Sequence, residues 1–247
     1  MAGIRRGGLG SVPAKIKTLP PELPLPLPPG VSFLIFGVRS LEREGGSFIT
    51  KVFNSAFLVD VEGQVLSRYH KQVLLAFGEY IPFTSVLSLV PGVPPIGEGF
   101  SRGEGPRTLD LSPTIRLASL ICYEDLMPWL SRRFVAGSHA NLLVNLTNDG
   151  WFGDTVAPWQ HARLAQWRAI ETRRSLVRAT NTGVTSVINP RGEMVDALPV
   201  YSTGVLNAKV PLMTTKTFYV RFGDWFIWIL TATALSVPLI RKFIHHH

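Results

Sequence analysis

Cysteine is almost absent from this sequence, because Cys122 is the only one among 247 residues. A single thiol excludes an internal disulfide, so either packing or chemistry must account for it. Charged residues are also scarce, at 17%, against about a quarter in typical soluble domains. The histidines outside the terminal triplet lack the spacing of metal ligands, and we therefore predict no metal site.

Acidic residues are outnumbered, at 17 against 25 lysines and arginines, which gives a net charge of +8 and a pI of about 10.0. The basic residues are scattered and do not form the basic region of a common nucleic-acid-binding module. We therefore expect no nucleic-acid partner. Anionic phospholipid is favoured instead, because the mean hydropathy of +0.20 indicates a membrane segment. Residues 1–10 have no apolar core, so we expect no secretory signal.

Proline dominates residues 20–29, which cannot sustain a helix or a central strand. Residues 1–30 are therefore predicted to be a disordered lead, rich in proline and glycine. An apolar strand is expected over 31–38. Two similar hairpins follow, over 52–69 and 183–196, and the second contains Asn-Pro-Arg-Gly, which is typical of a type I turn.

Strand and helix patterns alternate between the two hairpins. We predict strands over 115–122 and 141–146, and helices over 127–136 and 158–178. This alternation indicates a layered α/β fold in which the two strands are parallel neighbours. The loops that follow the two strands should then open at the same edge of the sheet, where ligands bind in such folds.

The C-terminal part contains a mostly apolar run of 23 residues, 218–240. A membrane-spanning helix needs about 20 such residues, so we predict one over 218–242. Trp225 and Trp228 match an interfacial aromatic belt, and the closing Arg-Lys pair indicates a cytoplasmic end, with the preceding domain facing outward. A buried core helix is the alternative. Residues 245–247, all histidine, are interpreted as a tag remnant.

Cys122 ends an apolar run, so a strand would present it at the carboxyl edge of a sheet, as a nucleophile requires. The alternative is a buried cysteine that only fills core space. Lys71 follows a predicted strand, and Glu79 comes eight residues later, behind a Phe-Gly turn that can fold it back. Such a Lys–Glu–Cys cluster would lower the pKa of the thiol and stabilise an oxyanion. Taken singly, the lysine and the glutamate could be solvated surface charges.

Four ordered runs carry a family resemblance, namely residues 69–82, 121–124, 145–153 and 178–183. They resemble the nitrilase (carbon–nitrogen hydrolase) superfamily, and most of all its membrane branch, the apolipoprotein N-acyltransferases. The resemblance implies an α/β fold: a nitrilase-like αββα sandwich over residues 31–215, incomplete at the N-terminus and followed by one C-terminal transmembrane helix.

The resemblance also implies roles for individual residues. Cys122 would be the nucleophile, and Lys71 would stabilise the oxyanion together with the backbone N–H of Tyr123. Glu79 would be the accessory carboxylate that orients the lysine.

Three further residues match positions that shape the lipid site of the family: Tyr123, Glu124 and Trp151. Their alternatives are packing in turns for the two aromatic residues and a salt bridge for Glu124. The implied reaction moves an acyl chain from a phospholipid, through a cysteine thioester, to the N-terminal amine of a diacylglyceryl-cysteine lipoprotein. It needs no metal or organic cofactor, and it places the catalytic domain on the periplasmic side of a bacterial inner membrane.

The sequence departs from the family pattern at its N-terminal end. The family's general-base glutamate lies in a Trp-Pro-Glu motif after an early strand, whereas the Pro-Glu pair here is Pro21-Glu22, without the tryptophan. We therefore expect an amino-terminally truncated chain in which Glu22 is the candidate base. A soluble-type amidase with the same cysteine chemistry, or a non-catalytic remnant that lacks its base, are the alternatives.

Overall fold

A computed structural model describes residues 31–43, 50–83 and 99–244. The chain forms two compact units, residues 1–114 and 115–247, and each is considered by itself. The predicted lead, the candidate base Glu22 and the terminal histidines lie outside the described residues.

The first unit contains an antiparallel sheet with the strand order β1-β2-β3. Its strands are β1 (Phe33–Arg43), β2 (Thr50–Asp60) and β3 (Val65–His70), and β4 (Leu109–Ser112) ends the unit. The predicted first hairpin is confirmed, and its turn closes with a hydrogen bond from the Gly63 N–H to the Asp60 carbonyl at 3.1 Å. Gly63 has φ 76°, a conformation that glycine adopts without steric cost.

The second unit contains a sheet in which strands follow the order β5-β6-β7-β8-β9. They are β5 (Ile115–Ile121), β6 (Leu142–Asn148), β7 (Ser175–Asn181), β8 (Ser186–Ile188) and β9 (Met194–Ala197). As predicted, β5 and β6 are parallel, and the second hairpin forms the antiparallel pair β8–β9. Strand β6 also pairs in parallel with β7. The α/β class predicted from the sequence is therefore confirmed.

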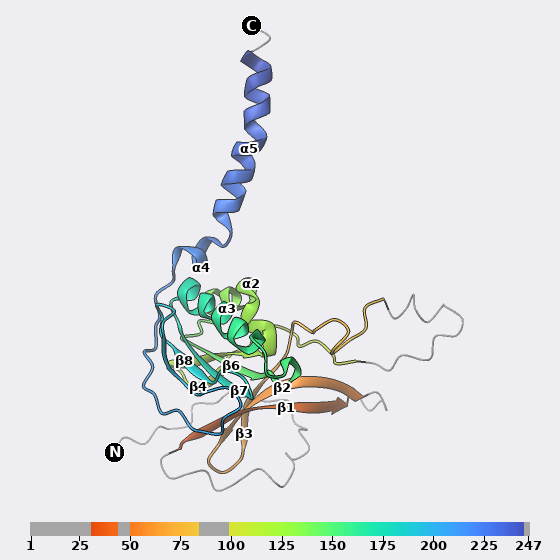
Figure 1. Ribbon diagram of the computed structural model, residues 1–247, viewed down its shortest axis with the longest axis vertical. Helices are drawn as coiled ribbons and strands as arrows, with labels where there is room; N and C mark the ends of the chain where they lie inside the picture. Colours follow the sequence, from red (N-terminus) through yellow and green to blue (C-terminus); the bar gives the residue numbers. More distant parts are fainter. Residues whose placement is uncertain (1–30, 44–49, 84–98, 245–247) are drawn as a thin grey trace, which may run out of the picture. The chain divides into compact units, whose positions relative to one another are not determined.

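Two longer helices, α2 (Pro128–Ala136) and α3 (Ala157–Thr172), lie side by side against this sheet (Figure 1). The predicted helix over 158–178 was too long, because Arg173 adopts a left-handed conformation with φ 52° that ends α3. The chain then enters strand β7. Short 3-10 helices follow two of the three parallel strands: η1 (Cys122–Leu126) after β5 and η2 (Gly150–Phe152) after β6.

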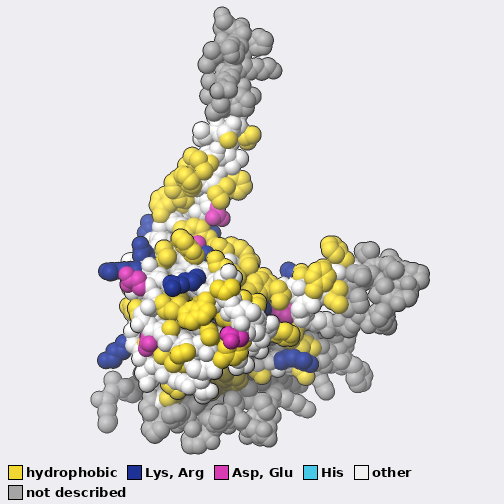
Figure 2. Space-filling view, viewed as in Figure 1, with side chains coloured by type: hydrophobic (Ala, Val, Ile, Leu, Met, Phe, Trp, Pro, Cys, Tyr) yellow, Lys and Arg dark blue, Asp and Glu magenta, His cyan; other side chains and the backbone are white. Residues whose placement is uncertain are grey.

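The apolar C-terminal run forms two helices, α4 (Phe218–Phe222) and α5 (Trp225–Ile244), rather than one. The break comes at Gly223, whose φ is 64°. Within the described segments, no helix has both the length and the hydropathy that a membrane crossing requires, so the predicted spanning helix over 218–242 is not confirmed. The alternative of a buried core helix is wrong, because Trp228 at 73% and Leu235 at 65% are largely exposed. Figure 2 shows hydrophobic side chains on the surface of the C-terminal helices.

Candidate active site

Cys122 lies at a sharp turn where β5 ends and η1 begins. Its φ of 54° is in the left-handed region, which residues other than glycine enter rarely and at an energetic cost. The five residues before it on β5 are buried, whereas Cys122 is only half-buried and carries a free thiol. The sequence prediction of a cysteine at the carboxyl end of a core strand is therefore confirmed, and Cys122 is not a fully buried packing residue.

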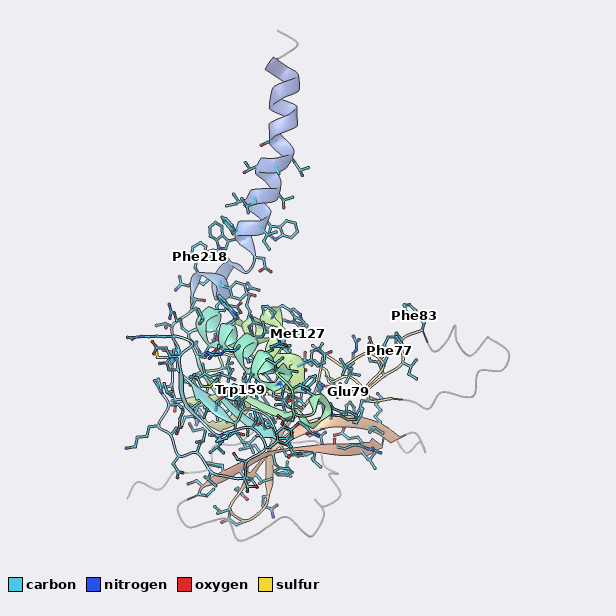
Figure 3. All side chains as sticks on the ribbon, viewed as in Figure 1. Phe77, Glu79, Phe83, Met127, Trp159 and Phe218 are labelled. Carbon is cyan, nitrogen blue, oxygen red and sulfur yellow. The ribbon has the colours of Figure 1, made fainter. Side chains whose placement is uncertain are left out.

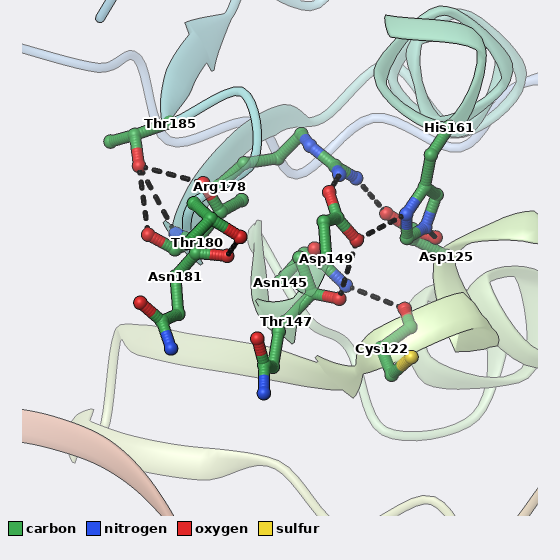
Figure 4. A network of polar contacts seen from close by, with 12 residues as sticks. Cys122, Asp125, Asn145, Thr147, Asp149, His161, Arg178, Thr180, Asn181 and Thr185 are labelled. Atoms are coloured by element: carbon green, nitrogen blue, oxygen red, sulfur yellow. Dashed lines mark hydrogen bonds and ion pairs between the residues drawn. The ribbon is translucent and has the colours of Figure 1, made fainter. Parts of the chain in front are cut away.

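The turn at Cys122 is held by side chains from two directions. The side-chain nitrogen of Asn145, on β6, donates to the carbonyl of Cys122 at 2.9 Å and to the carbonyl of Leu120 at 3.1 Å (Figure 4). On the other side, Glu124 Oε2 accepts the backbone N–H of Ile121 at 2.8 Å. These bonds fix the backbone on both sides of the sulfur.

Glu124 and Tyr123 follow the cysteine in η1, as the sequence requires. Glu124 is fully buried, and the contact of its carboxylate with the strand end was not anticipated. Tyr123 is half-buried. The assignment of both residues to a lipid site stays a prediction.

A cluster of four buried charged side chains lies beside the Cys122 turn (Figure 4). His161, on α3, contacts Asp125 Oδ1 through Nε2 at 2.8 Å and Asp149 Oδ1 through Nδ1 at 2.9 Å. Arg178, on β7, pairs with the other oxygen of Asp125 and lies 3.8 Å from Asp149 Oδ2. The cluster therefore ties η1, the end of β6, α3 and β7 together.

Both ring nitrogens of His161 face carboxylate oxygens, which only accept hydrogen bonds, so the imidazole must carry two protons. Burial by itself would lower the pKa of His161, but the hydrogen bonds to Asp125 and Asp149 outweigh burial and raise this pKa to about 9. With His161 and Arg178 positive and both aspartates negative, the cluster has no net charge. A neutral set of paired charges is the form in which charges are tolerated in a protein interior.

Sequence reasoning missed this cluster. Asp149 and Arg178 stand inside the runs that carry the family resemblance, and Asp125 directly follows one of them, but no spacing rule connects these residues with one another or with His161. The usable signal was the fold itself, because both aspartates follow neighbouring parallel strands and must lie at one edge of the sheet.

Trp151 lies in η2, in the loop after β6, and its side chain is 88% exposed. Packing in a turn, one of the two alternatives for this residue, is therefore wrong. The register that pairs Ile121 with Leu146 places the carboxyl ends of β5 and β6 at the same edge, as predicted. The Trp151 loop and the Cys122 turn thus open on that edge.

In the first unit, Lys71 and Glu79 form an ion pair. Lys71 follows β3 and is 1% exposed, and its Nζ lies 2.7 Å from Glu79 Oε2. Phe77, with φ 64°, makes the turn that brings Glu79 back (both are labelled in Figure 3). The Glu79 N–H donates to the Leu75 carbonyl at 2.8 Å. The predicted fold-back is confirmed, and neither residue is a solvated surface charge.

Several hydrogen bonds surround the carboxylate of Glu79. Burial alone would raise the pKa of Glu79, but hydrogen bonds from Lys71, from the Leu75 N–H and from Asn54 lower it below its usual value. The Leu75 N–H lies 2.9 Å from Oε2, and Asn54 Nδ2 lies 3.0 Å from Oε1. Glu79 is thus held as a carboxylate that fixes the ammonium of Lys71.

The two halves of the predicted triad lie in different units: Lys71 and Glu79 in the first, Cys122 in the second. No group of three or more His, Cys, Asp or Glu side chains in residues 31–43, 50–83 and 99–244 could hold a metal ion. A shallow hollow of about 450 Å³ on the outer face of α3, lined by Val156, Trp159, Gln160, Arg163 and Leu164, contains none of the candidate residues.

Comparison with known proteins decides the family. The sequence profile described as carbon-nitrogen hydrolase matches residues 32–219, which is most of the chain. The chain belongs to the carbon-nitrogen hydrolase family. Its nitrilase-like α/β fold follows from this membership, and the matched range includes Lys71, Glu79 and Cys122.

Among curated relatives, the apolipoprotein N-acyltransferase of Geobacter metallireducens is 42% identical over 217 residues, which cover 86% of this chain. That of Rhodopseudomonas palustris is 37% identical over 218 residues and 87% of this chain. The chain spans about 40% of the length of each of these relatives. Among solved structures, an amidase from Nesterenkonia sp. has a TM-score of 0.48 at 24% identity, over 68% of this chain and 57% of that one.

Proposed function

We propose that this chain carries out the acyl transfer of an apolipoprotein N-acyltransferase. The single observation that carries the proposal is the turn at Cys122, where the only cysteine of a carbon-nitrogen hydrolase chain leaves a buried parallel strand in a left-handed conformation. The names of the relatives supply the substrate class, which is a lipoprotein acceptor. A phospholipid is the proposed acyl donor.

The proposed reaction has two steps. The Cys122 thiolate attacks the ester carbonyl of the phospholipid, a carbon–sulfur bond forms, the ester carbon–oxygen bond breaks, and a lysophospholipid leaves with a proton. The N-terminal amine of the lipoprotein then attacks the thioester, a carbon–nitrogen bond forms, and the thiolate is released while the amine gives up a proton. A thioester suits this transfer because splitting a difficult acyl transfer into two steps lowers each barrier.

Lys71 and Glu79 enter the proposal as charge-stabilising groups. A buried ammonium can stabilise the oxyanion of a tetrahedral intermediate, and Glu79 fixes its position through the 2.7 Å contact. The backbone N–H of Tyr123 would be the second oxyanion donor. Glu22 remains the candidate general base, and the replacement Glu22→Gln tests it, because an unchanged acylation rate would remove Glu22 from the mechanism.

Exposed apolar side chains support a location at a membrane, here proposed to be the periplasmic face of a bacterial inner membrane. Helices α4 and α5 expose a set of large apolar residues (Figure 2). They are Phe218, Phe222, Trp225, Phe226, Ile227, Trp228, Ile229, Leu230 and Leu235. Together with Trp151, these residues would place the lipid substrate within reach of Cys122. Tyr123 and Glu124 are proposed to shape the lipid site.

Mass spectrometry of the full chain tests the proposal. The chain is incubated in detergent with phosphatidylethanolamine and digested, and the Cys122 peptide is examined for an added acyl mass. We expect this mass in the wild type, its absence in Cys122→Ala, and its loss when a diacylglyceryl-cysteine peptide is added, with the acyl chain then on the peptide amine.

Two other outcomes would contradict the proposal in different ways. Hydrolysis of small amides without any acyl mass from phospholipid would indicate the amidase-type alternative. A rate of iodoacetamide alkylation at Cys122 no faster than that of a short cysteine peptide, again without an acyl mass, would indicate a non-catalytic chain.

A further inference from the structure

Asn145 is a buried side chain that touches the candidate nucleophile without being part of the predicted triad. It is fully buried on β6, where the sheet register places it opposite Leu120 of β5. From there, its Nδ2 reaches the carbonyls of both Leu120 and Cys122, at 3.1 and 2.9 Å (Figure 4).

The orientation of the Asn145 amide follows from its partners. Both contacted atoms are carbonyl oxygens, which accept hydrogen bonds and cannot donate them, so the nitrogen and not the oxygen must face them. The two hydrogens of the amide nitrogen are then both used. A short side chain on a strand between β5 and β7 leaves little freedom, and the Cys122 carbonyl is held in one direction.

That direction determines where the next backbone N–H points. In a planar trans peptide, the carbonyl of one residue and the N–H of the following residue point in opposite directions. Because Asn145 holds the Cys122 carbonyl, the N–H of Tyr123 is directed away from Asn145. We infer that Asn145 is a positioning residue for acyl transfer: through the Cys122–Tyr123 peptide it orients the Tyr123 N–H as an oxyanion donor, an inference that rests on the proposed function.

The chain offers a matched control, Asn141. This second asparagine precedes β6, is also buried, at 5% exposure, and also bonds to the backbone of β5, accepting the Arg116 N–H through Oδ1 at 3.0 Å. It acts at the start of β5, whereas Asn145 acts at the end. Replacing either asparagine with leucine removes one buried side-chain amide and its bonds to β5, but only Asn145→Leu frees the Cys122 carbonyl.

Two reagents separate the oxyanion from the thiol. With p-nitrophenyl butyrate, the Cys122 sulfur bonds to the ester carbonyl carbon and an electron pair moves onto oxygen. When that pair returns, the ester carbon–oxygen bond breaks and p-nitrophenolate leaves. With iodoacetamide, the sulfur displaces iodide in one step and no oxyanion forms. The ratio of the acylation rate to the alkylation rate therefore measures the oxyanion donors and not the reactivity or accessibility of the thiol.

We expect Asn145→Leu to lower the acylation rate roughly 10- to 100-fold, because removing an oxyanion donor outright costs about 100- to 1000-fold. Alkylation should stay near the wild-type rate, and Asn141→Leu should leave both rates near wild type. If Asn145→Leu fails to fold, Asn145→Asp replaces it. A protonated carboxyl can donate to one carbonyl, so the acylation-to-alkylation ratio of that variant should fall as pH rises and the carboxyl ionises.

The outcomes distinguish this inference from the proposed function. A wild-type chain that iodoacetamide alkylates but the ester does not acylate would overturn both. A wild-type chain that is acylated, while Asn145→Leu keeps the wild-type ratio or loses both rates in parallel, would overturn the role of Asn145 and leave the proposed function standing. If Asn141→Leu lost as much of the acylation rate as Asn145→Leu, the role of Asn145 would likewise be structural only.

Discussion

The cluster around His161 makes the stability of the protein depend on pH in a direction that the structure fixes. His161 lies between Asp125 and Asp149, with Arg178 completing the set, and its pKa is raised from 6.5 to about 9. A group that binds its proton more tightly when folded stabilises the fold below its unfolded pKa. That contribution is lost as pH rises through the folded pKa. The perturbation we consider is His161→Gln, which removes the titrating group.

The size of the effect follows from the shift in pKa. One pKa unit corresponds to about 1.4 kcal/mol, so a rise from 6.5 to about 9 corresponds to about 3 kcal/mol. His161 is 6% exposed, so solvent screens the interaction little. The stabilisation should be complete below pH 6.5, decline between 6.5 and about 9, and be absent above that range.

Denaturant unfolding of wild type and His161→Gln at several pH values measures this contribution. Groups other than His161 titrate in both proteins, so the difference between their free energies of unfolding isolates the histidine. We expect that difference to be larger at about pH 6 than at about pH 10, by about 3 kcal/mol.

A difference between wild type and His161→Gln that stays constant over this range would refute the reasoning. It would mean that His161 has the same pKa in the folded and unfolded chain, and that one ring nitrogen does not donate to its carboxylate. A difference that grows with rising pH would be a stronger contradiction, because burial and not the aspartates would then control the imidazole.

Three further predictions concern neighbouring parts of the chain. Gly183→Ala should destabilise the protein by about 1 to 3 kcal/mol in thermal unfolding, because a Cβ at this position would lie 2.8 Å from the Cβ of buried Asp149. Glu79→Gln should cost about 3 kcal/mol at neutral pH, since it removes the negative charge that lies 2.7 Å from the buried ammonium of Lys71. Because the pKa of Glu79 is lowered in the fold, this cost should shrink as pH falls below 4.5 in denaturant titrations. Trp151→Ala should change unfolding free energy by less than about 0.5 kcal/mol, as its side chain is 88% exposed, yet should slow acylation by phospholipid vesicles more than acylation by p-nitrophenyl butyrate.

Local patterns were enough to predict the elements that carry the candidate site. The apolar run that ends in Cys122 predicted a strand, and the alternation with helices placed that strand in a layered α/β fold. The fold-back of Glu79 onto Lys71 was also predictable, because a Phe-Gly turn lies between them and both charges gain from pairing. Each of these features depends on residues close together in the sequence.

The end of helix α3 was not predictable because tertiary contacts decide it. Helix α3 ends at Thr172, yet residues 173–178 contain no proline or glycine that would stop a helix. Arg174 is instead drawn into the interior, where it donates to the carbonyls of Ala140 and Thr215 at 2.8 and 2.7 Å. The helix therefore ends just before Arg174, whose side chain donates to these distant carbonyls. Ser175 then begins β7, the strand that pairs with β6.

The same reasoning explains why the Cys122 turn needs so many partners. A left-handed backbone conformation at a residue other than glycine costs about 1 kcal/mol or more. It persists only when interactions with the surrounding structure stabilise it by more than this cost. The carbonyl of Cys122 is held by Asn145, the N–H of Ile121 by Glu124, and the end of η1 by the pairing of Asp125 with His161. These bonds reach a neighbouring strand, the turn itself and a helix, so no single element can relax alone. The strain therefore stays at the sulfur-bearing residue, where a fixed backbone is what an acyl-transfer site requires.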